Sequence, residues 1–394
     1  MSRDCDLLVA GGGPAGSSLA MLAANGGARV VLTERARFPR DKVCGEFLSA
    51  EGCRVIERLG LLDVLLDRGA RWMDSCRITS GEGARIDAEL PDLGTGGRNA
   101  LGVSRAVLDA VLLDHARSHG VEVVERCEAF DPLFRDGRVV GFRIRDVGSV
   151  GKSRELRASL VVAADGRRSV LARRLHPELC DPRRSGPHSW FGLKVHLAAA
   201  SSDLGQRVEL HLFDGGYAGL AVVDGQRINL CLIVSVRALR ACGGSPDRLL
   251  RERVLANSFA RESIADARPC STWHSVGPLR WGARRPAASG ALFVGDSAGT
   301  LDPFSGEGMS NALRAAELAL PFVEAAITRG GLDDALALQY ASEWRRAFAP
   351  VTRRVRRLGR LLERPALAGP ALRLLDGVAG AWAPRLIHAT RTGI

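Results

Sequence analysis

The sequence lacks long apolar runs and any close pairing of its cysteines. No run of eighteen apolar residues occurs, which argues against a membrane-spanning helix. The nine cysteines are scattered, odd in number and without a C-x-x-C spacing, so neither a disulfide framework nor a zinc or other metal site is expected. Asp4 and Asp6 lead directly into an apolar strand, which is not the pattern of a secretory signal. We therefore expect a cytoplasmic protein in a reducing compartment.

Lysine is also scarce, and this bears on the net charge of +11. Only three of the 55 basic residues are lysine, a skew that indicates a biased genome rather than a selected basic surface. Without aromatic-interleaved basic stretches, no nucleic-acid partner is expected. From Arg345 to Ile394, however, eleven arginines face only Glu363 and Asp376. This C-terminal stretch is either a solvated helix face or a contact for acidic partners or a peripheral membrane surface. The oligomeric state stays open.

The first 34 residues show the pattern of a β-turn-α-β unit. Residues 6–10 (DLLVA) form a short apolar run that ends at a glycine-rich turn, as in a buried parallel strand. A helix is expected over residues 17–24 and a second buried strand over 29–33. Between residues 190 and 236, alternating apolar segments separated by Asp-Gly turns predict antiparallel hairpins instead.

The predicted fold class is therefore α/β, with an antiparallel sheet inserted into a Rossmann-type domain and a helical C-terminus. The α/β domain is expected to be discontinuous, over residues 1–75, 98–180 and 280–330. Residues 76–97 and 181–279 form the expected substrate domain, and residues 331–394 the C-terminal helical segment.

Residues 11–16 (GGGPAG) match G-x-G-x-x-G between the first strand and the first helix. In this motif Gly11 permits a tight turn, Gly13 lets the backbone approach a pyrophosphate, and Gly16 lets the helix pack closely on the strand. Glu34 closes the second strand, where its carboxylate can accept hydrogen bonds from an adenosine ribose. The combination predicts a dinucleotide site and disfavours a 2′-phosphate there.

Two further strands end in polar turns. Residues 160–169 (LVVAADGRRS) end in Asp165-Gly166, and residues 291–299 (ALFVGDSAG) contain Gly295-Asp296. Open α/β sheets bind ligands at such carboxyl ends. Residues 306–309 then open a helix whose free N–H groups can meet an anionic ligand edge.

Together, VVAADGRRSVLAR and GDSAGTLDPFSGEGMSNAL resemble the Asp-Gly and Gly-Asp motifs of one flavoprotein family. That family contains para-hydroxybenzoate-hydroxylase-type monooxygenases, flavin-dependent halogenases and geranylgeranyl reductases. The resemblance covers about residues 4–320 and implies non-covalent FAD in a glutathione-reductase-type domain. The cofactor contacts that it and the motifs imply are Gly11, Gly13, Pro14, Ala15, Gly16, Glu34, Arg35, Lys42, Cys44, Arg105, Asp165, Asp296, Gly306, Gly308 and Met309.

Residues 40–49 (RDKVCGEFLS) resemble the K-x-C-G segment of geranylgeranyl-reductase-like proteins, where the loop passes over the isoalloxazine. Cys44 then either tunes the flavin or donates a proton, or it is a small, inert residue against a ring. Glu46 is a second candidate acid or base in the same loop.

Two departures bear on the reaction. The W-x-W-x-I-P segment expected of a halogenase is absent, and so is a lysine between Lys42 and Lys152. The aromatic segment typical of geranylgeranyl reductases is replaced by residues 215–223 (GGYAGLAVV), with glycine in place of tryptophan. The leading expectation is thus an NAD(P)H-dependent monooxygenase that hydroxylates or epoxidises a hydrophobic or aromatic metabolite, free or carrier-bound, through a flavin C4a-hydroperoxide. A reductase of polyprenyl or polyene double bonds is the alternative, and a non-catalytic flavin-binding partner protein is the third.

The expected substrate domain offers polar candidates at alternating positions. Along residues 190–197, one face carries Trp190, Gly192, Lys194 and His196, and it either lines a pocket or faces solvent. The substrate residues predicted from these strands are Trp190, His196, His211 and Tyr217.

Overall fold

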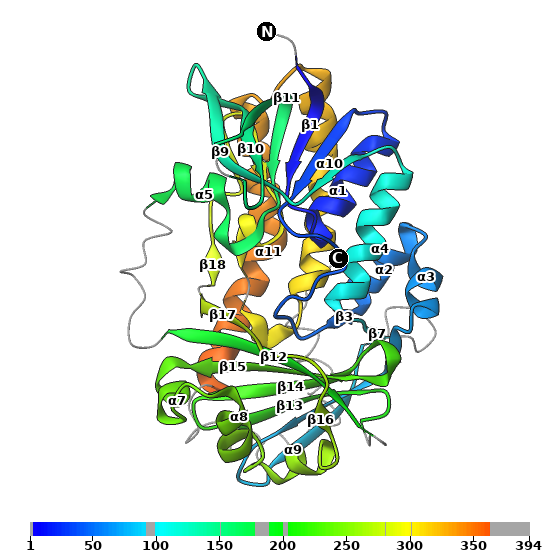
Figure 1. The fold of residues 1–394 in the computed structure, drawn as a ribbon, viewed down its shortest axis with the longest axis vertical. Helices are drawn as coiled ribbons and strands as arrows, with labels where there is room; N and C mark the ends of the chain where they lie inside the picture. The colour runs from blue at the N-terminus through cyan, green and yellow to red at the C-terminus, as the bar shows by residue number, and fades with distance from the viewer. Residues whose placement is uncertain are drawn as a thin grey trace.

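The computed structural model describes residues 3–91, 99–149, 151–177, 189–199, 204–279, 281–300 and 302–362. The chain forms two sheet layers, one above the other in Figure 1, joined by helices and by a small three-stranded sheet. Residues 363–394 of the predicted C-terminal segment, like residues 92–98 and 178–188, lie outside the described residues.

The upper sheet has the strand order β19-β20-β11-β1-β2-β8, with β10 and β9 continuing from β11. Its centre is parallel, since β20, β11, β1, β2 and β8 pair in that sense. The apolar runs of β1 (Cys5–Ala10) and β2 (Val30–Glu34) are buried along their length, apart from a half-buried Asp6. The remaining strands are β8 (Glu122–Glu125), β9 (Cys127–Arg135), β10 (Arg138–Asp146), β11 (Arg154–Ala163), β19 (Ala287–Ala288) and β20 (Ala291–Phe293).

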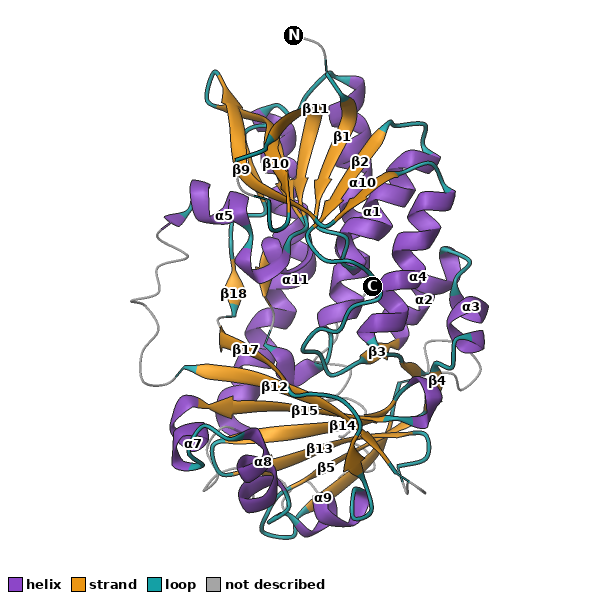
Figure 2. Cartoon of the chain, viewed as in Figure 1, coloured by secondary structure: helices purple, strands orange, loops and turns teal. Residues whose placement is uncertain are grey.

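Three helices pack together against this sheet, as Figure 2 shows. They are α1 (Pro14–Asn25), α4 (Arg105–Ser118) and α10 (Gly308–Thr328), with α1 in contact with both others. Helix α2 (Ala50–Arg58) packs on α10, and α3 (Leu62–Asp67) lies beside α4. The short helix α5 (Val170–Leu175) follows β11. One apolar core extends through these helices and the upper sheet.

The lower sheet is built mainly from antiparallel hairpins, in the order β16-β12-β15-β14-β13-β5-β6, with β17 also pairing with β12. A second core lies between this sheet and the short helices α7 (Val236–Ala241), α8 (Pro246–Leu249) and α9 (Ser258–Ser263). The strands are β5 (Ser75–Thr79), β6 (Arg85–Glu89), β12 (Trp190–Ala198), β13 (Arg207–Phe213), β14 (Gly216–Val222), β15 (Ile228–Ser235), β16 (Arg268–Pro269) and β17 (His274–Leu279).

Several elements connect the two layers. The small sheet β3-β7-β4 consists of β3 (Phe47–Ser49), β7 (Ala100–Gly102) and β4 (Arg71–Met73). Strand β18 (Gly282–Ala283) pairs with β21 (Gly299–Thr300). The long helix α11 (Asp334–Leu362) runs from the upper layer down to the lower one (Figure 1). Within the described residues, no helix combines the length and apolarity needed to cross a membrane.

These observations confirm the predicted fold class, an α/β nucleotide-binding domain with an antiparallel sheet inserted in its sequence. The domain boundaries drawn from the sequence stay a prediction. The chain passes into the lower sheet twice, first for β5 and β6 and later for β12 to β17. The parallel pairing of β5 with β13 joins the two passes.

Candidate functional site

A cavity with a volume of about 420 Å³ lies between the two layers. Its upper part is lined by the glycine turn after β1 and by the turns after β11 and β20. Its lower part is lined by side chains of the antiparallel sheet. The sequence motifs and the expected substrate sheet therefore meet at one continuous space.

The glycine turn leaves no room for side chains at two of its positions. Gly11 has φ of 108°, and a Cβ there would stand 2.5 Å from the Ala164 oxygen. A Cβ on Gly16 would stand 1.9 Å from the Gly11 oxygen. Gly13, the N-cap residue of α1, makes no side-chain cap, and Pro14 occupies the first turn. The N–H groups at the start of α1 are therefore available to an anion in the cavity.

Glu34 sits at the end of β2, directly beside this turn. Its two carboxylate oxygens accept hydrogen bonds from the backbone N–H groups of Gly12 and Ala36, both at 2.8 Å. The side chain is buried and does not line the cavity itself. Arg35, the next residue, is exposed and also lies off the cavity. Glu34 thus fixes the turn, and its ribose contact stays a prediction.

Three cationic side chains gather beside Gly13. The guanidinium groups of Arg40 and Arg105 both approach the position that a Gly13 Cβ would take, at 3.9 Å. Asp109 binds both of them, at 2.9 Å from Arg40 and 2.6 Å from Arg105. Lys42 lines the same part of the cavity, and burial together with repulsion from Arg105 and Arg40 lowers its pKa to about 8. Asp109 and Glu34, whose carboxylate lies 3.8 Å from Arg40, thus hold the two arginines, and cationic groups at this part of the cavity suit a pyrophosphate.

The Asp-Gly and Gly-Asp turns contact each other through Ser297. The Ser297 hydroxyl donates to Asp165 Oδ1 at 3.2 Å and accepts from the Gly166 N–H at 2.8 Å. Asp165 Oδ2 accepts from the Val170 N–H at the start of α5, and burial raises the pKa of this carboxyl despite that bond. Asp165 therefore holds the two turns together and does not line the cavity, whereas Asp296 does.

The turn before α10 also borders the cavity. Gly306, Gly308 and Met309 all line it, as the sequence analysis expected of this helix start. Gly306 has φ of 69°, in the left-handed region that favours glycine. Asp302 caps the preceding turn by accepting from the Phe304 N–H at 3.1 Å. The N–H groups at the start of α10 thus lie at the cavity wall, as do those of α1.

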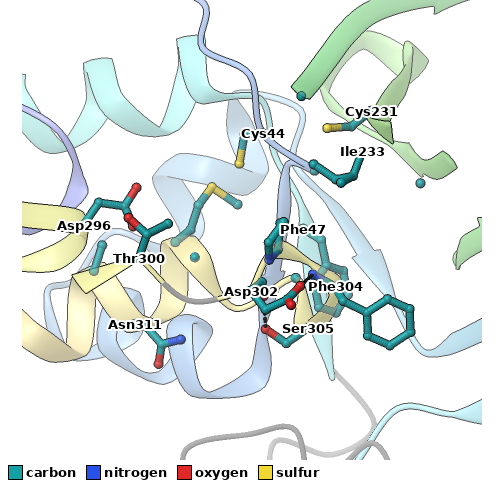
Figure 3. A pocket seen from close by; sticks show the side chains of 18 of the residues that line it. Cys44, Phe47, Cys231, Ile233, Asp296, Thr300, Asp302, Phe304, Ser305 and Asn311 are labelled. Carbon is teal, nitrogen blue, oxygen red and sulfur yellow. Dashed lines mark hydrogen bonds between the residues drawn. The ribbon is translucent and has the colours of Figure 1, made fainter. Parts of the chain in front are cut away.

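The lower part of the cavity is apolar. Side chains of β5, β6, β13 and β15 project into it, together with aromatic residues from β3, the turn after β21, and α11. Figure 3 shows Phe47, Phe304 and Ile233 among them. The apolar lining comprises Phe47, Ile78, Ile86, Ala88, Leu90, Val208, Leu210, Leu220, Ile233, Val276, Leu279, Phe304, Trp344 and Phe348.

Two thiols line the cavity where its two parts meet. Cys44 comes from the loop before β3 and Cys231 from β15 (Figure 3). Burial, with a smaller contribution from Cys44, raises the pKa of Cys231 to about 12, so this thiol keeps its proton. Cys44 Sγ accepts from the Glu46 N–H at 3.4 Å and lies within hydrogen-bonding reach of the Arg105 guanidinium. Cys44 thus has polar partners at the cavity wall.

Glu46 is fully buried, and its side chain points away from the cavity, toward β12. Its Oε1 accepts from Lys194 Nζ at 2.5 Å and from the Arg105 N–H at 2.8 Å. Its Oε2 meets His196 Nε2 at 2.7 Å. Because Glu46 also has φ of 55°, uncommon for a non-glycine residue, these contacts hold a strained backbone in place. One carboxylate therefore joins the Cys44 loop, the start of α4 and the lower sheet.

Asp41 completes this cluster from the outer side. It accepts from Lys194 Nζ at 2.9 Å, and His274 lies 3.9 Å from its other oxygen. Burial would lower the pKa of Lys194, but attraction to Glu46 and bonds to Glu46 and Asp41 raise it overall. Asp41, Glu46 and His196 have the spacing of a metal site, but the Lys194 ammonium already supplies the cation between the two carboxylates.

These positions correct part of the sequence analysis. Lys194 and His196 do not face solvent, because the Cys44 loop covers that face of β12. His211 does not line the cavity. It is buried on the other face of β13, between Thr79 at 2.8 Å and Glu209 at 3.0 Å. Trp190 also lies off the cavity, against Trp281.

Tyr217, by contrast, lines the cavity with its ring edge-on to Phe304. The sequence analysis did not single out Arg40 and Asp41, although both belong to the RDKVCGEFLS segment, or Asp109, four residues after Arg105. Nor did it identify the apolar wall from β5 and β6. The alternation of Cys76 and Ile78 with Arg77 was the available signal for the first of these strands.

The residues at this site fit FAD. The crowded glycine turn, the cations beside Gly13 and the starts of α1 and α10 at the cavity wall suit a pyrophosphate and an anionic ring edge. Asp296 faces the same space, where a ribityl chain has hydroxyl groups to donate. The lower, apolar part of the cavity is left for a substrate.

Comparison with known proteins agrees with this geometry. The chain is 28% identical over 360 residues to a digeranylgeranylglycerophospholipid reductase of Methanoculleus marisnigri, covering 88% of this chain and 83% of that protein. It is 29% identical over 368 residues to a menaquinone reductase of Mycolicibacterium smegmatis, covering 87% and 80%.

Among solved structures, PqsL of Pseudomonas aeruginosa, described as a probable FAD-dependent monooxygenase, has a TM-score of 0.73. Its sequence is 22% identical, with 93% of this chain and 99% of that chain covered, so the likeness concerns the fold alone. The model of the FAD binding domain family matches residues 4–355, nearly the full length that the structure describes. The chain belongs to the FAD binding domain family.

Proposed function

We propose that this FAD-dependent oxidoreductase reduces carbon–carbon double bonds in a long apolar substrate of the polyprenyl or polyene class. The observation that carries this proposal is the lining of the lower cavity. Its walls are aliphatic and aromatic side chains, mainly from strands of the lower sheet and from α11, in continuity with the flavin site. A hydrocarbon chain needs this kind of wall, because it offers no group for a polar side chain to bind.

The relatives support a reductase over an oxygenase. Two curated relatives matched over most of their length are named as reductases, one of a digeranylgeranyl phospholipid and one of menaquinone. Gly219, at the position where the resemblance to geranylgeranyl reductases implied a tryptophan, lines the cavity together with Tyr217. We interpret this glycine as a substitution that changes the shape of the substrate the cavity accepts, while the reaction stays a reduction.

In the proposed reaction FAD, once reduced, supplies the electron pair, and the chain supplies position and protons. The apolar walls hold the substrate chain and exclude water from it. Cys44 places its Sγ at the junction of the two parts of the cavity, as the candidate proton donor. Arg105 and the Glu46 N–H fix the position of that sulfur. We further propose NAD(P)H as the reductant of the flavin and the cytoplasm as the location.

One anaerobic experiment tests the proposal. The flavin is reduced with dithionite, and geranylgeranyl lipids or menaquinone are added without oxygen. Reduction predicts the return of flavin absorbance and a product heavier by two hydrogens for each double bond. Bleaching of the oxidised flavin by NADH or NADPH identifies the reductant in the same cuvette. No reoxidation by any of these lipids would overturn the proposal, and a chain without any turnover would be a flavin-binding partner protein.

Monooxygenation is the second candidate. The same water-excluding walls suit oxygen chemistry on a hydrophobic metabolite, with Trp344 and Phe348 closing one side. In that case the reduced flavin stays reduced with substrate alone and reoxidises only when oxygen is admitted, with one oxygen atom incorporated into the product.

A further inference from the structure

Helix α11 combines a cavity wall and a strongly charged surface. Trp344 and Phe348 are buried and line the cavity. The other side of the same turns is exposed and carries arginines. These exposed residues are Arg345, Arg346, Arg353, Arg354, Arg356 and Arg357, here named the arginine face.

The arginine face carries a much larger excess of positive charge than the chain as a whole. Residues 345–357 hold six arginines and no acidic residue, while the whole chain has 55 basic and 44 acidic residues. More than half of the net charge of +11 therefore resides in this short segment. Glu343, one turn earlier, pairs with Arg346 at 2.6 Å with both side chains largely exposed, which neutralises little of it.

The arginine face also adjoins the cavity. Asp302 lines the cavity, and burial raises the pKa of its carboxyl while the charge of Arg356 opposes that rise. At Gly359, on the next turn of α11, a Cβ would stand 3.0 Å from Asp302 Oδ2. The charged segment thus ends beside the turn that carries Phe304, an aromatic residue of the apolar wall.

We propose that the arginine face docks the protein on an anionic phospholipid surface, so that apolar substrate passes from the bilayer into the cavity. This partner rests on the proposed function, because a long apolar substrate partitions into lipid. Clustered arginines bind anionic headgroups through charge, each adding about a fivefold gain in affinity at low salt. The arginines extend along several helical turns, so the arginine face matches an extended lipid surface better than it matches a single acidic carrier protein.

Vesicle flotation tests the docking. The full chain is mixed with phosphatidylcholine vesicles containing 30 mol% phosphatidylglycerol, about the anionic content that gives such a surface its negative potential, or with phosphatidylcholine alone. The variant R345Q/R346Q/R353Q/R357Q removes four exposed charges and leaves Arg356 beside Asp302 in place. The matched control, R135Q/R143Q/R145Q/R154Q, removes four exposed arginines from β9, β10 and β11 in the upper layer.

The parent chain and the control are expected to float with anionic vesicles and not with neutral ones. The α11 variant should bind about a hundredfold more weakly or worse, and high salt should release the parent. Equal binding of the α11 variant, or no binding by the parent, would overturn the proposal. Arginine-dependent binding to polyglutamate without binding to vesicles would overturn it in favour of an acidic carrier.

A turnover assay separates this proposal from the function it rests on. With prenyl lipid embedded in anionic vesicles, the α11 variant should lose activity, and with the same lipid in detergent it should match the parent. If the arginines direct vesicle binding but no lipid is reduced in either form, the reductase proposal alone fails. If activity in vesicles is equally unaffected by the α11 variant and the control, the docking proposal fails.

Discussion

The buried cluster around Lys194 makes a quantitative prediction for Lys194→Met. Lys194 is fully buried, and its ammonium binds Glu46 at 2.5 Å and Asp41 at 2.9 Å. Methionine retains the shape of the chain but removes the charge, which leaves the fully buried Glu46 carboxylate with His196 and the Arg105 N–H alone. Removing one partner of a buried ion pair costs about 3–5 kcal/mol of folding free energy.

The expected loss of stability corresponds to a fall of about 4–6 °C in the melting temperature for a chain of this size. The double variant Glu46→Gln with Lys194→Met should recover part of it, because it also removes the stranded charge. Exposed Lys152→Met is the control and should change the free energy of unfolding by about 0.5 kcal/mol or less. Urea unfolding followed by flavin and tryptophan fluorescence measures all three.

The same variants test whether the Lys194 cluster holds the Cys44 loop in position. If the cluster positions Cys44, the double variant should still fold, but a thiol reagent should alkylate its Cys44 at a different rate from that of the parent. The reason is that residue 46 then contacts β12 more weakly, so the Cys44 loop is held less firmly. The reasoning is refuted if Lys194→Met lies within about 1 kcal/mol of the parent. It is equally refuted if the double variant is no more stable than the single one, because the stranded carboxylate would then carry no cost.

Three further predictions concern the cofactor and the thiol. Gly16→Ala should abolish FAD binding, since its Cβ would stand 1.9 Å from the Gly11 oxygen, whereas Gly81→Ala has open space and should bind normally by flavin fluorescence. Because FAD favours the charged form of Lys42, whose pKa is lowered to about 8, FAD affinity should be level below that pH and fall above it. An unchanged affinity up to pH 9.5, or the same fall in Lys42→Arg, would contradict this. Cys44→Ala should lower the rate of substrate reduction about a hundredfold while leaving FAD bound, and a rate equal to that of the parent would remove Cys44 from the reaction.

The fold was accessible from the sequence wherever local rules decide it. The glycine turn, the buried strands 6–10 and 29–33, and the Asp-Gly hairpin turns each depend on a few neighbouring residues. The reason is steric, because a Cβ on Gly11 or on Gly16 would clash with backbone atoms that lie close by in a turn of this type. The same locality explains why the helix expected over residues 17–24 lies within α1, Pro14–Asn25.

The site was less accessible, because its key contacts join distant segments. Alternation along β12 indicated that Lys194 and His196 share a face, but not that a loop 150 residues earlier covers it. His211 follows the same alternation on β13, and its face turns out to pack against Asn257 and the neighbouring helices. Pattern alone cannot distinguish a polar face that lines a cavity from one that closes a core.

The position of Glu46 shows how the two parts of the cavity depend on each other. Its carboxylate contacts Arg105 at the flavin end and Lys194 and His196 in the substrate sheet, while its N–H contacts the Cys44 sulfur. A left-handed backbone at a residue other than glycine persists only where surrounding contacts over-determine it. Here those contacts come from both layers, so a displacement of the substrate sheet is transmitted to the thiol and to the arginine beside Gly13. A variant that loosens the sheet at Lys194 is therefore expected to alter FAD affinity as well as substrate turnover, although Lys194 itself lines neither part of the cavity.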